Sequence, residues 1–564
     1  MEWRYDGCSP GLDCGLDAGP LRGLTLCAMR AFVYQHGGPG VFSGLSTGDV
    51  KCKFLLPCTS RLRCSYAALL SMQESPEVGR ATAFISHAYF YEFLDVLEAV
   101  EVWESRQGEG RHYYYFDLFV VNQHGQGSKV PFHVLRDEFG QGVVGAGRTL
   151  LVLDDSASAM RRLWCVFEVA VTCAEGIPFE VLMSRRHEAA FRSQLVQGCD
   201  VVLARTLAVD VELADAKEAS DADNIRAVVR NGQGFLRTNQ LVLGAMTQWM
   251  HAQGMAALAG MPLAERGQSD LIFNLVGMLK EQGRHGEALP LQEEIYAAHC
   301  TALGEGDAQT LSCLSNLGLL LKDLGRHAEA ASALRRALEG RRAALPACHP
   351  QILASLINLA LVLRESCNAA LAEPLITEAL EGRRLAARAR DAVENEDPDT
   401  LACMVYAGMV KQDLGKVEEA ELLVRCALRG RRAALPPGHP EVLYTCSALA
   451  GILGGAGGAS RAAEAAALHE ESVKGLRRLL GEGHLSTLRR VVAWAAFLLA
   501  QGSCAQAAEE LGPTLLRCQE VLGKAHAVTE ECSRLLASAK AGLSSSVPAT
   551  AAEDEARNAE VGAC

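Results

Sequence analysis

The feature that most constrains this 564-residue chain is a block of sequence that returns at a nearly fixed spacing. The segment GRHGEA at residues 283–288 returns as GRHAEA at residues 325–330, a shift of 42, and again as GKVEEA at residues 415–420. A period of this length is typical of one supersecondary unit stacked on copies of itself. The C-terminal half is therefore predicted to be a repeat array.

A second landmark, the turn residue that precedes each unit, gives the same period independently. It falls at Asp307, His349, Asp397, His439, His484 and His526, with steps of 42, 48, 42, 45 and 42. The two longer steps contain an acidic stretch at residues 389–399 and a glycine-rich stretch at residues 451–460. Extra length in loops costs little free energy, so both insertions fit an array of about six units over residues 269–537.

Each unit has the pattern of two helices joined by a tight turn. Residues 310–325 place apolar side chains at helical spacing and end on glycine, and residues 327–345 carry a second helical pattern. The His-Pro corner that follows cannot continue a helix. Neither helix can bury its apolar face alone, so neighbouring hairpins must stack into an all-α solenoid.

These repeats resemble the 42-residue tetratricopeptide repeats of kinesin light chains, with the pattern HPxxLxxxxNLAxLL, then glycine, then a second helix that contains Glu-Ala. The resemblance covers residues 269–537 and implies a superhelix whose groove binds peptides or partner proteins. The first interpretation is therefore a protein–protein interaction scaffold. No long heptad stretch precedes the repeats to join a motor subunit, so a kinesin cargo adaptor is only a third interpretation.

Three asparagines, Asn274, Asn316 and Asn358, recur 42 residues apart on the first helix of successive units. In tetratricopeptide families this position lines the groove and bonds to the backbone of the bound peptide, so the resemblance makes these residues candidate partner contacts. The alternative is a structural asparagine that bonds to the adjacent hairpin, since buried amides need partners. Later repeats depart from the pattern at Tyr406, Ala448 and Ala493.

Basic side chains recur at two further positions of the unit. Six residues beyond each asparagine stand Lys280, Lys322 and Arg364. They suit an acidic partner, although a solvated helix face is the alternative. Arginine pairs such as Arg341 and Arg342 end the second helices, where cations are expected to face the negative end of the helix.

Residues 79–231 have a different texture, in which short β-rich runs alternate with helices. Strands are expected at residues 81–86, 113–121, 148–155 and 178–183, and this alternation is typical of a parallel sheet with crossover helices. Ligands of such sheets bind beyond the carboxyl ends of the strands. That rule gathers six side chains on one rim: Ser86, His87, Asn122, His124, Asp154 and Asp155.

The segments FISHA at residues 84–88 and LWCVFE at residues 163–168 resemble the first box and the third-helix signature of TIR domains. The resemblance implies a TIR- or flavodoxin-like α/β fold that signals or self-associates. In TIR enzymes that cleave NAD the glutamate of this motif is catalytic. By resemblance, that role falls to Glu168.

The second interpretation of the chain is therefore an NAD glycohydrolase that the repeats regulate, with Ser86, His87 and Trp164 binding the substrate. A carboxylate such as Glu168 can stabilise a cationic, oxocarbenium-like sugar. The serine found two residues before the tryptophan in plant TIR sequences is Arg162 here. The alternative for Glu168 is a solvated or salt-bridged helix residue.

Bulk properties exclude several other classes. A net charge of −13 argues against a nucleic-acid surface, which needs clustered cations. The most apolar helical stretch, residues 235–261, is interrupted by polar residues, so membrane insertion is not expected. The 20 cysteines lack the paired spacing of a zinc site, so we expect no metal and no cofactor, with NAD only as a substrate. No secretory signal is apparent, which favours a cytoplasmic location.

Three remaining segments complete the expected domain plan. Residues 1–78, rich in glycine and cysteine, carry no clear period and are left unassigned and partly disordered. Residues 232–268 are expected to form a helical linker between the α/β domain and the repeats. Residues 538–564 are rich in alanine, serine and acidic residues and are expected to be a disordered tail.

Overall fold

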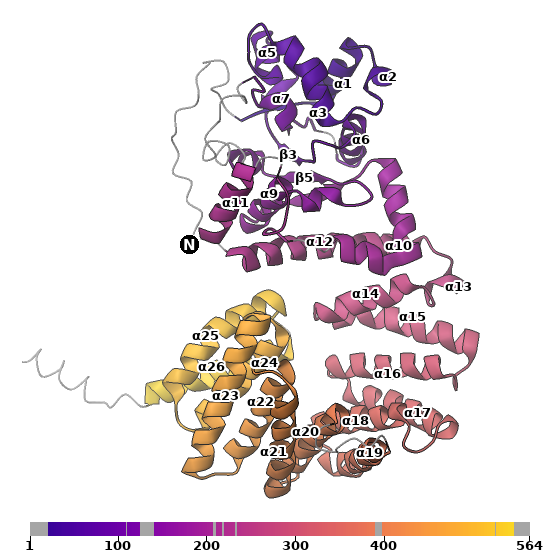
Figure 1. Cartoon of the computed structure of the whole chain (residues 1–564), viewed down its shortest axis with the longest axis vertical. Coiled ribbons are helices and arrows are strands. Elements are labelled where there is room, and N and C mark those ends of the chain that lie inside the picture. The colour runs from indigo at the N-terminus through magenta and orange to yellow at the C-terminus, as the bar shows by residue number, and fades with distance from the viewer. Residues whose placement is uncertain are drawn as a thin grey trace, which may run out of the picture. The chain divides into compact units, whose positions relative to one another are not determined.

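The computed structural model describes residues 21–108, 110–124, 140–206, 210–216, 219–231, 234–389, 397–524 and 526–545 (Figure 1). The chain divides into two compact units, Met1–Leu275 and Val276–Cys564. The described helices include none that is both long enough and apolar enough to cross a membrane.

Unit 1 is built on a mixed sheet with the strand order β2-β1-β4-β3-β5-β6 among the described residues. The strands are β1 (Arg22–Leu24), β2 (Val78–Arg80), β3 (Ala83–Ser86), β4 (Tyr114–Tyr115), β5 (Thr149–Val152) and β6 (Phe179–Leu182). Strands β4, β3, β5 and β6 run parallel, whereas β1 pairs antiparallel with both β2 and β4. The prediction of a parallel sheet is therefore confirmed for these four strands and wrong at the β1–β2 edge.

The strand predicted over residues 113–121 is much shorter in the structure. Only Tyr114–Tyr115 pair with neighbours, and the chain then turns into α7 (Asp117–Val120). The Asp117 carboxylate accepts a hydrogen bond from the backbone N–H of Leu118 at 2.8 Å, which favours the turn. A short apolar run does not distinguish a strand from a buried helical turn, and that ambiguity produced the error.

The segment left unassigned in the sequence is folded from Leu21 onward. Besides β1 and β2 it forms α1 (Leu26–Gln35), α2 (Pro39–Phe42), α3 (Thr47–Val50), α4 (Leu56–Thr59) and α5 (Tyr66–Met72). The Phe32 ring on α1 lies 5.3 Å from Phe119 and 6.1 Å from Phe42, and all three rings are fully buried. An aromatic core thus joins these helices to the sheet, and residues 1–20 lie outside the described part.

Most of the other helices of unit 1 either contact the sheet directly or pack on a helix that does. These other helices are α6 (Phe93–Glu104), α9 (Leu163–Ala174), α10 (Arg185–Thr206), α11 (Ala219–Asn231), α12 (Gly234–Ala259) and α13 (Leu263–Arg266). Helix α12 packs against both α9 and α10. Most of the predicted linker is therefore a structural helix of unit 1.

Beyond unit 1 the chain continues as helical hairpins stacked in chain order (Figure 1). The first helices are α14 (Asp270–Glu281), α16 (Ala308–Asp323), α18 (Pro350–Glu365), α20 (Pro398–Asp413), α22 (Pro440–Gly455) and α24 (Leu485–Ala500). The second helices are α15 (His285–Leu303), α17 (His327–Ala344), α19 (Ala369–Arg388), α21 (Val417–Ala434), α23 (Ala459–Leu480) and α25 (Cys504–Val521). Helix α26 (Ala527–Ser545) continues beyond the predicted end at residue 537, and residues 546–564 lie outside the described part.

The turn landmarks of the sequence are helix N-caps in the structure. The Asp307 carboxylate accepts from the backbone N–H of Gln309 at 2.7 Å, and the His349 Nδ1 accepts from Gln351 at 3.3 Å. Four more landmarks cap their helices in the same way: Asp397, His439, His484 and His526. The repeated residues therefore mark where each first helix begins, because their side chains satisfy a backbone donor that has no partner within the helix.

In several hairpins the two helices approach closely at a small residue. A Cβ atom on Gly318 of α16 would lie 2.8 Å from the Leu334 side chain of α17. The equivalent residue is Ala360 on α18 and Ala450 on α22, and both are fully buried. The small residue of the repeated NLAxLL pattern thus fixes the spacing within the hairpin.

Candidate functional site

Successive first helices form the inner wall of the repeat array. Helices α16, α18, α20 and α22 each contact the next first helix along the chain, in addition to their own second helices, and α24 contacts α26 in the same way. Successive second helices make no contacts of comparable extent among the described residues. Elements that touch across repeats lie on the inside of a curved solenoid, where binding surfaces form.

The three predicted asparagines lie on α14, α16 and α18. Asn316 is exposed, whereas Asn274 and Asn358 are partly buried. Throughout the described chain none of these three side-chain amides has a hydrogen-bond partner. The alternative of a bond to the adjacent hairpin is therefore not what the structure has, and the amides of Asn316 and Asn358 are available on the inner wall.

The basic residues six positions further on are already engaged in two of three cases. The Lys322 Nζ lies 3.2 Å from the Asp323 carboxylate. The Arg364 Nε lies 2.5 Å from the Asp413 carboxylate of α20, in the next repeat. Lys280, on α14, is partly buried. Arg364 thus joins neighbouring repeats, and its predicted role in holding an acidic partner has no support in this geometry.

The paired arginines of the last helical turn form two kinds of inter-helix contact. Arg341 is buried, and its Nη1 donates to the Ser315 Oγ at 2.9 Å and to the Ser355 Oγ at 2.6 Å. Arg342 instead pairs with Glu378 of the next second helix at 2.6 Å. The same two roles recur in Arg431, bound to Thr445, and Arg432, bound to Glu471. These cations lie in the last turn of their helices, as predicted, and in addition bond to side chains of neighbouring helices.

In unit 1 the structure brings Ser86 and Glu168 together. The Ser86 hydroxyl, at the end of β3, donates a 2.5 Å hydrogen bond to a carboxyl oxygen of Glu168 on α9. Glu168 is 7% exposed, and burial raises its pKa to about 8, with the nearby Asp117 carboxylate acting in the same direction. Glu168 is therefore protonated at neutral pH, and the prediction of a solvated residue does not hold.

His87 completes this buried cluster. Its Nδ1 lies 3.7 Å from the Asp117 carboxylate, which also accepts a 2.9 Å hydrogen bond from the Tyr89 hydroxyl. Burial lowers the pKa of His87, so the imidazole is neutral. Trp164 is partly buried on α9, with its ring 6.4 Å from that of Phe167. Of the predicted substrate-binding residues, Ser86 and His87 thus lie close to Glu168.

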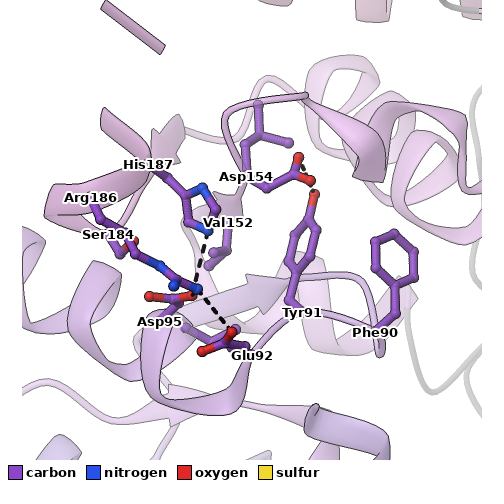
Figure 2. A pocket seen from close by; sticks show the side chains of 11 residues that line it. Phe90, Tyr91, Glu92, Asp95, Val152, Asp154, Ser184, Arg186 and His187 are labelled. Atoms are coloured by element: carbon purple, nitrogen blue, oxygen red, sulfur yellow. Dashed lines mark hydrogen bonds and ion pairs between the residues drawn. The ribbon is translucent and has the colours of Figure 1, made fainter. Parts of the chain in front are cut away.

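A separate pocket of about 200 Å³ opens at the carboxyl ends of β5 and β6 (Figure 2). Figure 2 shows Arg186 reaching towards Asp95 and Glu92, while the Tyr91 hydroxyl donates to Asp154 at 3.2 Å. Glu168 is not part of its lining. The pocket and the Ser86–Glu168 cluster are therefore distinct features.

The predicted rim residues divide between these features and a third location. Asp155 bonds to the His187 Nδ1 at 2.6 Å, beside the pocket. Asn122 donates to the Arg63 carbonyl at 2.8 Å, and the His124 Nε2 lies 2.7 Å from the Thr59 hydroxyl. Asn122 and His124 thus anchor the folded segment that precedes β2, a role that could not be predicted while that segment was unassigned.

Comparison with known proteins identifies the hairpins. Two family models described as tetratricopeptide repeat match residues 268–343 and residues 400–441. The hairpins are tetratricopeptide repeats. No curated protein matches the chain.

Solved structures of tetratricopeptide proteins share low identity with this chain. A Podospora anserina protein named for a kinesin light chain with nearly identical TPR-like repeats is 22% identical, covering 37% of this chain and 95% of its own, with a TM-score of 0.30. A tetratricopeptide repeat protein from Parabacteroides merdae is 16% identical, covering 53% and 95%, with a TM-score of 0.36. A Rap protein complexed with Competence and Sporulation Factor is 14% identical, covering 67% and 99%, with a TM-score of 0.34.

Sequence reasoning missed side chains in both units. Tyr91, Arg186 and His187 follow strand ends but belong to no repeated or motif-like pattern. In the tetratricopeptide array it missed Arg490 on α24, which faces the ring of Tyr444 on α22 at 5.5 Å. One signal in the sequence could have directed attention to these later repeats: they lack the asparagine, and other side chains take its place.

Proposed function

We propose that this protein is an interaction scaffold whose tetratricopeptide array binds an extended segment of a partner protein along its inner wall. One observation carries the proposal: Asn316 and Asn358 present side-chain amides without partners on adjacent first helices. A carboxamide offers both donors and an acceptor, which matches the N–H and C=O of a peptide group. Binding would satisfy amides that the fold leaves unpaired.

The proposal is tested by selecting peptides from a displayed random library against the full-length chain. The double variant N316A/N358A is expected to weaken binding of the selected peptides by about tenfold or more, because two hydrogen bonds contribute about 1 kcal/mol each. The matched control is Glu339→Ala, an exposed residue on the second helix α17. Selection of no peptide, or equal affinity in the double variant and the control, contradicts the proposal.

For unit 1 we propose a TIR-like module that self-associates or signals. The four parallel strands and the position of Glu168 on α9 beside β3 support this role. Sedimentation of the full-length chain over a range of concentrations tests self-association. A mass that stays monomeric with and without a selected peptide argues against it. A cytoplasmic location belongs to the same proposal and is tested by imaging the tagged chain.

The enzymatic alternative, an NAD glycohydrolase, is favoured by one feature, the juxtaposition of Ser86 with a Glu168 whose pKa burial raises to about 8. Perturbed carboxyls are common at functional sites. The rate of a reaction that requires the ionised Glu168 carboxylate should therefore increase as the pH rises towards about 8. Nicotinamide release from NAD by the wild type, and its loss in Glu168→Gln, would support this alternative, and intact NAD with both proteins would end it.

A further inference from the structure

The last repeats replace the groove asparagines with a different set of side chains. Tyr406 on α20 takes the asparagine position, while Ala448 and Ala493 take it on α22 and α24. Arg490 on α24 stands at a position that earlier repeats fill with small residues, namely Cys313, Ser355, Cys403 and Thr445. A large cation thus occupies a position that is buried in the earlier repeats, three residues before the asparagine position.

Arg490 has no partner of opposite charge in the described chain. Its Nε is buried without an acceptor, and its guanidinium carbon lies 5.5 Å from the centre of the Tyr444 ring. Five other arginines have a buried Nε without an acceptor, but each is engaged through further interactions: Arg226, Arg266, Arg341, Arg383 and Arg384. Arg490 is therefore the exception within this group.

The guanidinium of Arg490 on α24 lies against a side chain of the preceding first helix. It faces the Tyr444 ring of α22 at 5.5 Å, and α22 and α24 contact each other as successive first helices, which form the inner wall. Burial lowers the pKa of Arg490. The arginine thus reaches from α24 onto α22, and its neighbour there is aromatic.

A neighbouring histidine does not neutralise this cation. His469 on α23 is 2% exposed, its Nδ1 has no partner, and its ring lies 5.3 Å from that of Phe497. Burial, together with the charge of Arg490, lowers the pKa of His469 to about 4, so the ring is neutral. An unpaired cation beside neutral rings is costly, because its lost hydration is not replaced by an opposite charge.

From these contacts we infer that Arg490 binds a carboxylate of the partner peptide, with the Tyr444 ring beside it. One guanidinium matches one carboxylate in charge and in its two parallel hydrogen bonds. The carboxylate belongs either to an acidic side chain or to the C-terminus of the peptide. This inference rests on the proposed groove function and specifies which chemistry the last repeats recognise.

The test uses an array of synthetic octapeptides in which one position holds glutamate or its uncharged isostere glutamine, each made with a free and an amidated C-terminus. Full-length wild type is expected to prefer the carboxylate form, by side chain or by terminus, about tenfold or more. Arg490→Met is expected to lose this preference. The matched control, Arg489→Met, removes an adjacent exposed arginine and is expected to retain it.

The melting temperature separates recognition from a structural role. Arg490→Met should melt at or above the wild-type temperature, because it removes an unpaired and partly buried cation. A markedly lower melting temperature, or a carboxylate preference that survives in Arg490→Met, overturns the inference. If peptides bind the wild type without any carboxylate preference, the inference about Arg490 is overturned, while the proposed groove function stands. Absence of all peptide binding defeats the proposed groove function as well.

Discussion

Replacing Gly408 with alanine tests whether close approach of the two helices limits the stability of a hairpin. A Cβ atom on Gly408 of α20 would lie 2.4 Å from the Val424 Cγ2 and 3.2 Å from the Ala420 carbonyl oxygen of α21. Val424 is fully buried and β-branched, so it has little freedom to rotate away. The backbone of α21 must therefore shift to accept one methyl group.

The size of the effect follows from two opposing terms. Overpacking a core costs about 1–3 kcal/mol, whereas replacing a glycine inside a helix with alanine gains about 1 kcal/mol. Gly451→Ala on α22 is the matched control, because a Cβ atom there meets no atom within 4 Å. The difference in free energy of unfolding between the two variants thus isolates the overpacking term, about 1–3 kcal/mol.

Thermal unfolding of the helical signal by circular dichroism measures both variants against the wild type. The control is expected to melt at or above the wild-type temperature, and Gly408→Ala clearly below the control. Alanine occurs at the equivalent positions Ala360 and Ala450, so the methyl group itself is compatible with the fold. If Gly408→Ala melts together with Gly451→Ala, the helices of this hairpin adjust freely and the reasoning from close approach is refuted.

Two further predictions concern buried charge. Arg341→Ala should lower the free energy of unfolding of the array by about 3 kcal/mol or more, because two buried hydroxyl partners lose a charged donor. Arg342→Ala breaks an exposed ion pair and should cost under about 1 kcal/mol in the same unfolding assay. Equal losses in the two variants would contradict this assignment. In unit 1 the native Glu168 holds its proton up to about pH 8, whereas the unfolded residue loses its proton near pH 4.5. The stability that Glu168 contributes is therefore complete below pH 4.5 and is lost as the pH rises to about 8. Glu168→Gln should flatten that part of the stability profile measured by denaturant unfolding, and an unchanged slope would refute the raised pKa.

The repeat array was predictable because its signals are local and repeated. The landmarks Asp307 and His349 were recognised as turns from spacing alone, and each caps the helix that follows it. Unit 1 offered fewer such signals. The three-residue strand β1 is stabilised by its pairing with distant β2 and β4, and no local pattern marks it.

Residues of the candidate sites could be predicted from the sequence only where they recur at the repeat spacing or lie within a recognisable motif. Asn316 and Asn358 were found because they recur, and Ser86 and Glu168 because they lie in motif-like segments. Arg490 could not be found in this way, because its partner Tyr444 comes from another repeat and meets it only after the helices stack. A side chain that breaks the repeat is recognisable as functional only once its neighbours are known.

Different positions within the repeat unit thus contribute to the stability of the array and to recognition of a partner. Arg341 and Arg431 stand at the same place in their units, and each bonds to a hydroxyl on the following first helix, Ser355 and Thr445 respectively. The asparagine position behaves differently, since it changes from Asn358 to Tyr406 to Ala448 while the hairpins continue to stack. The arginine position also varies, to His299, Leu476 and Cys518 in other units, but the side chain there stays buried. Stacking therefore requires a buried side chain at that position and places no single demand on the wall position. Exchanging Asn358 for tyrosine should consequently alter which peptides bind while leaving the melting temperature within a few degrees of the wild type, and a collapse of the array in that variant would show that the two functions share one position.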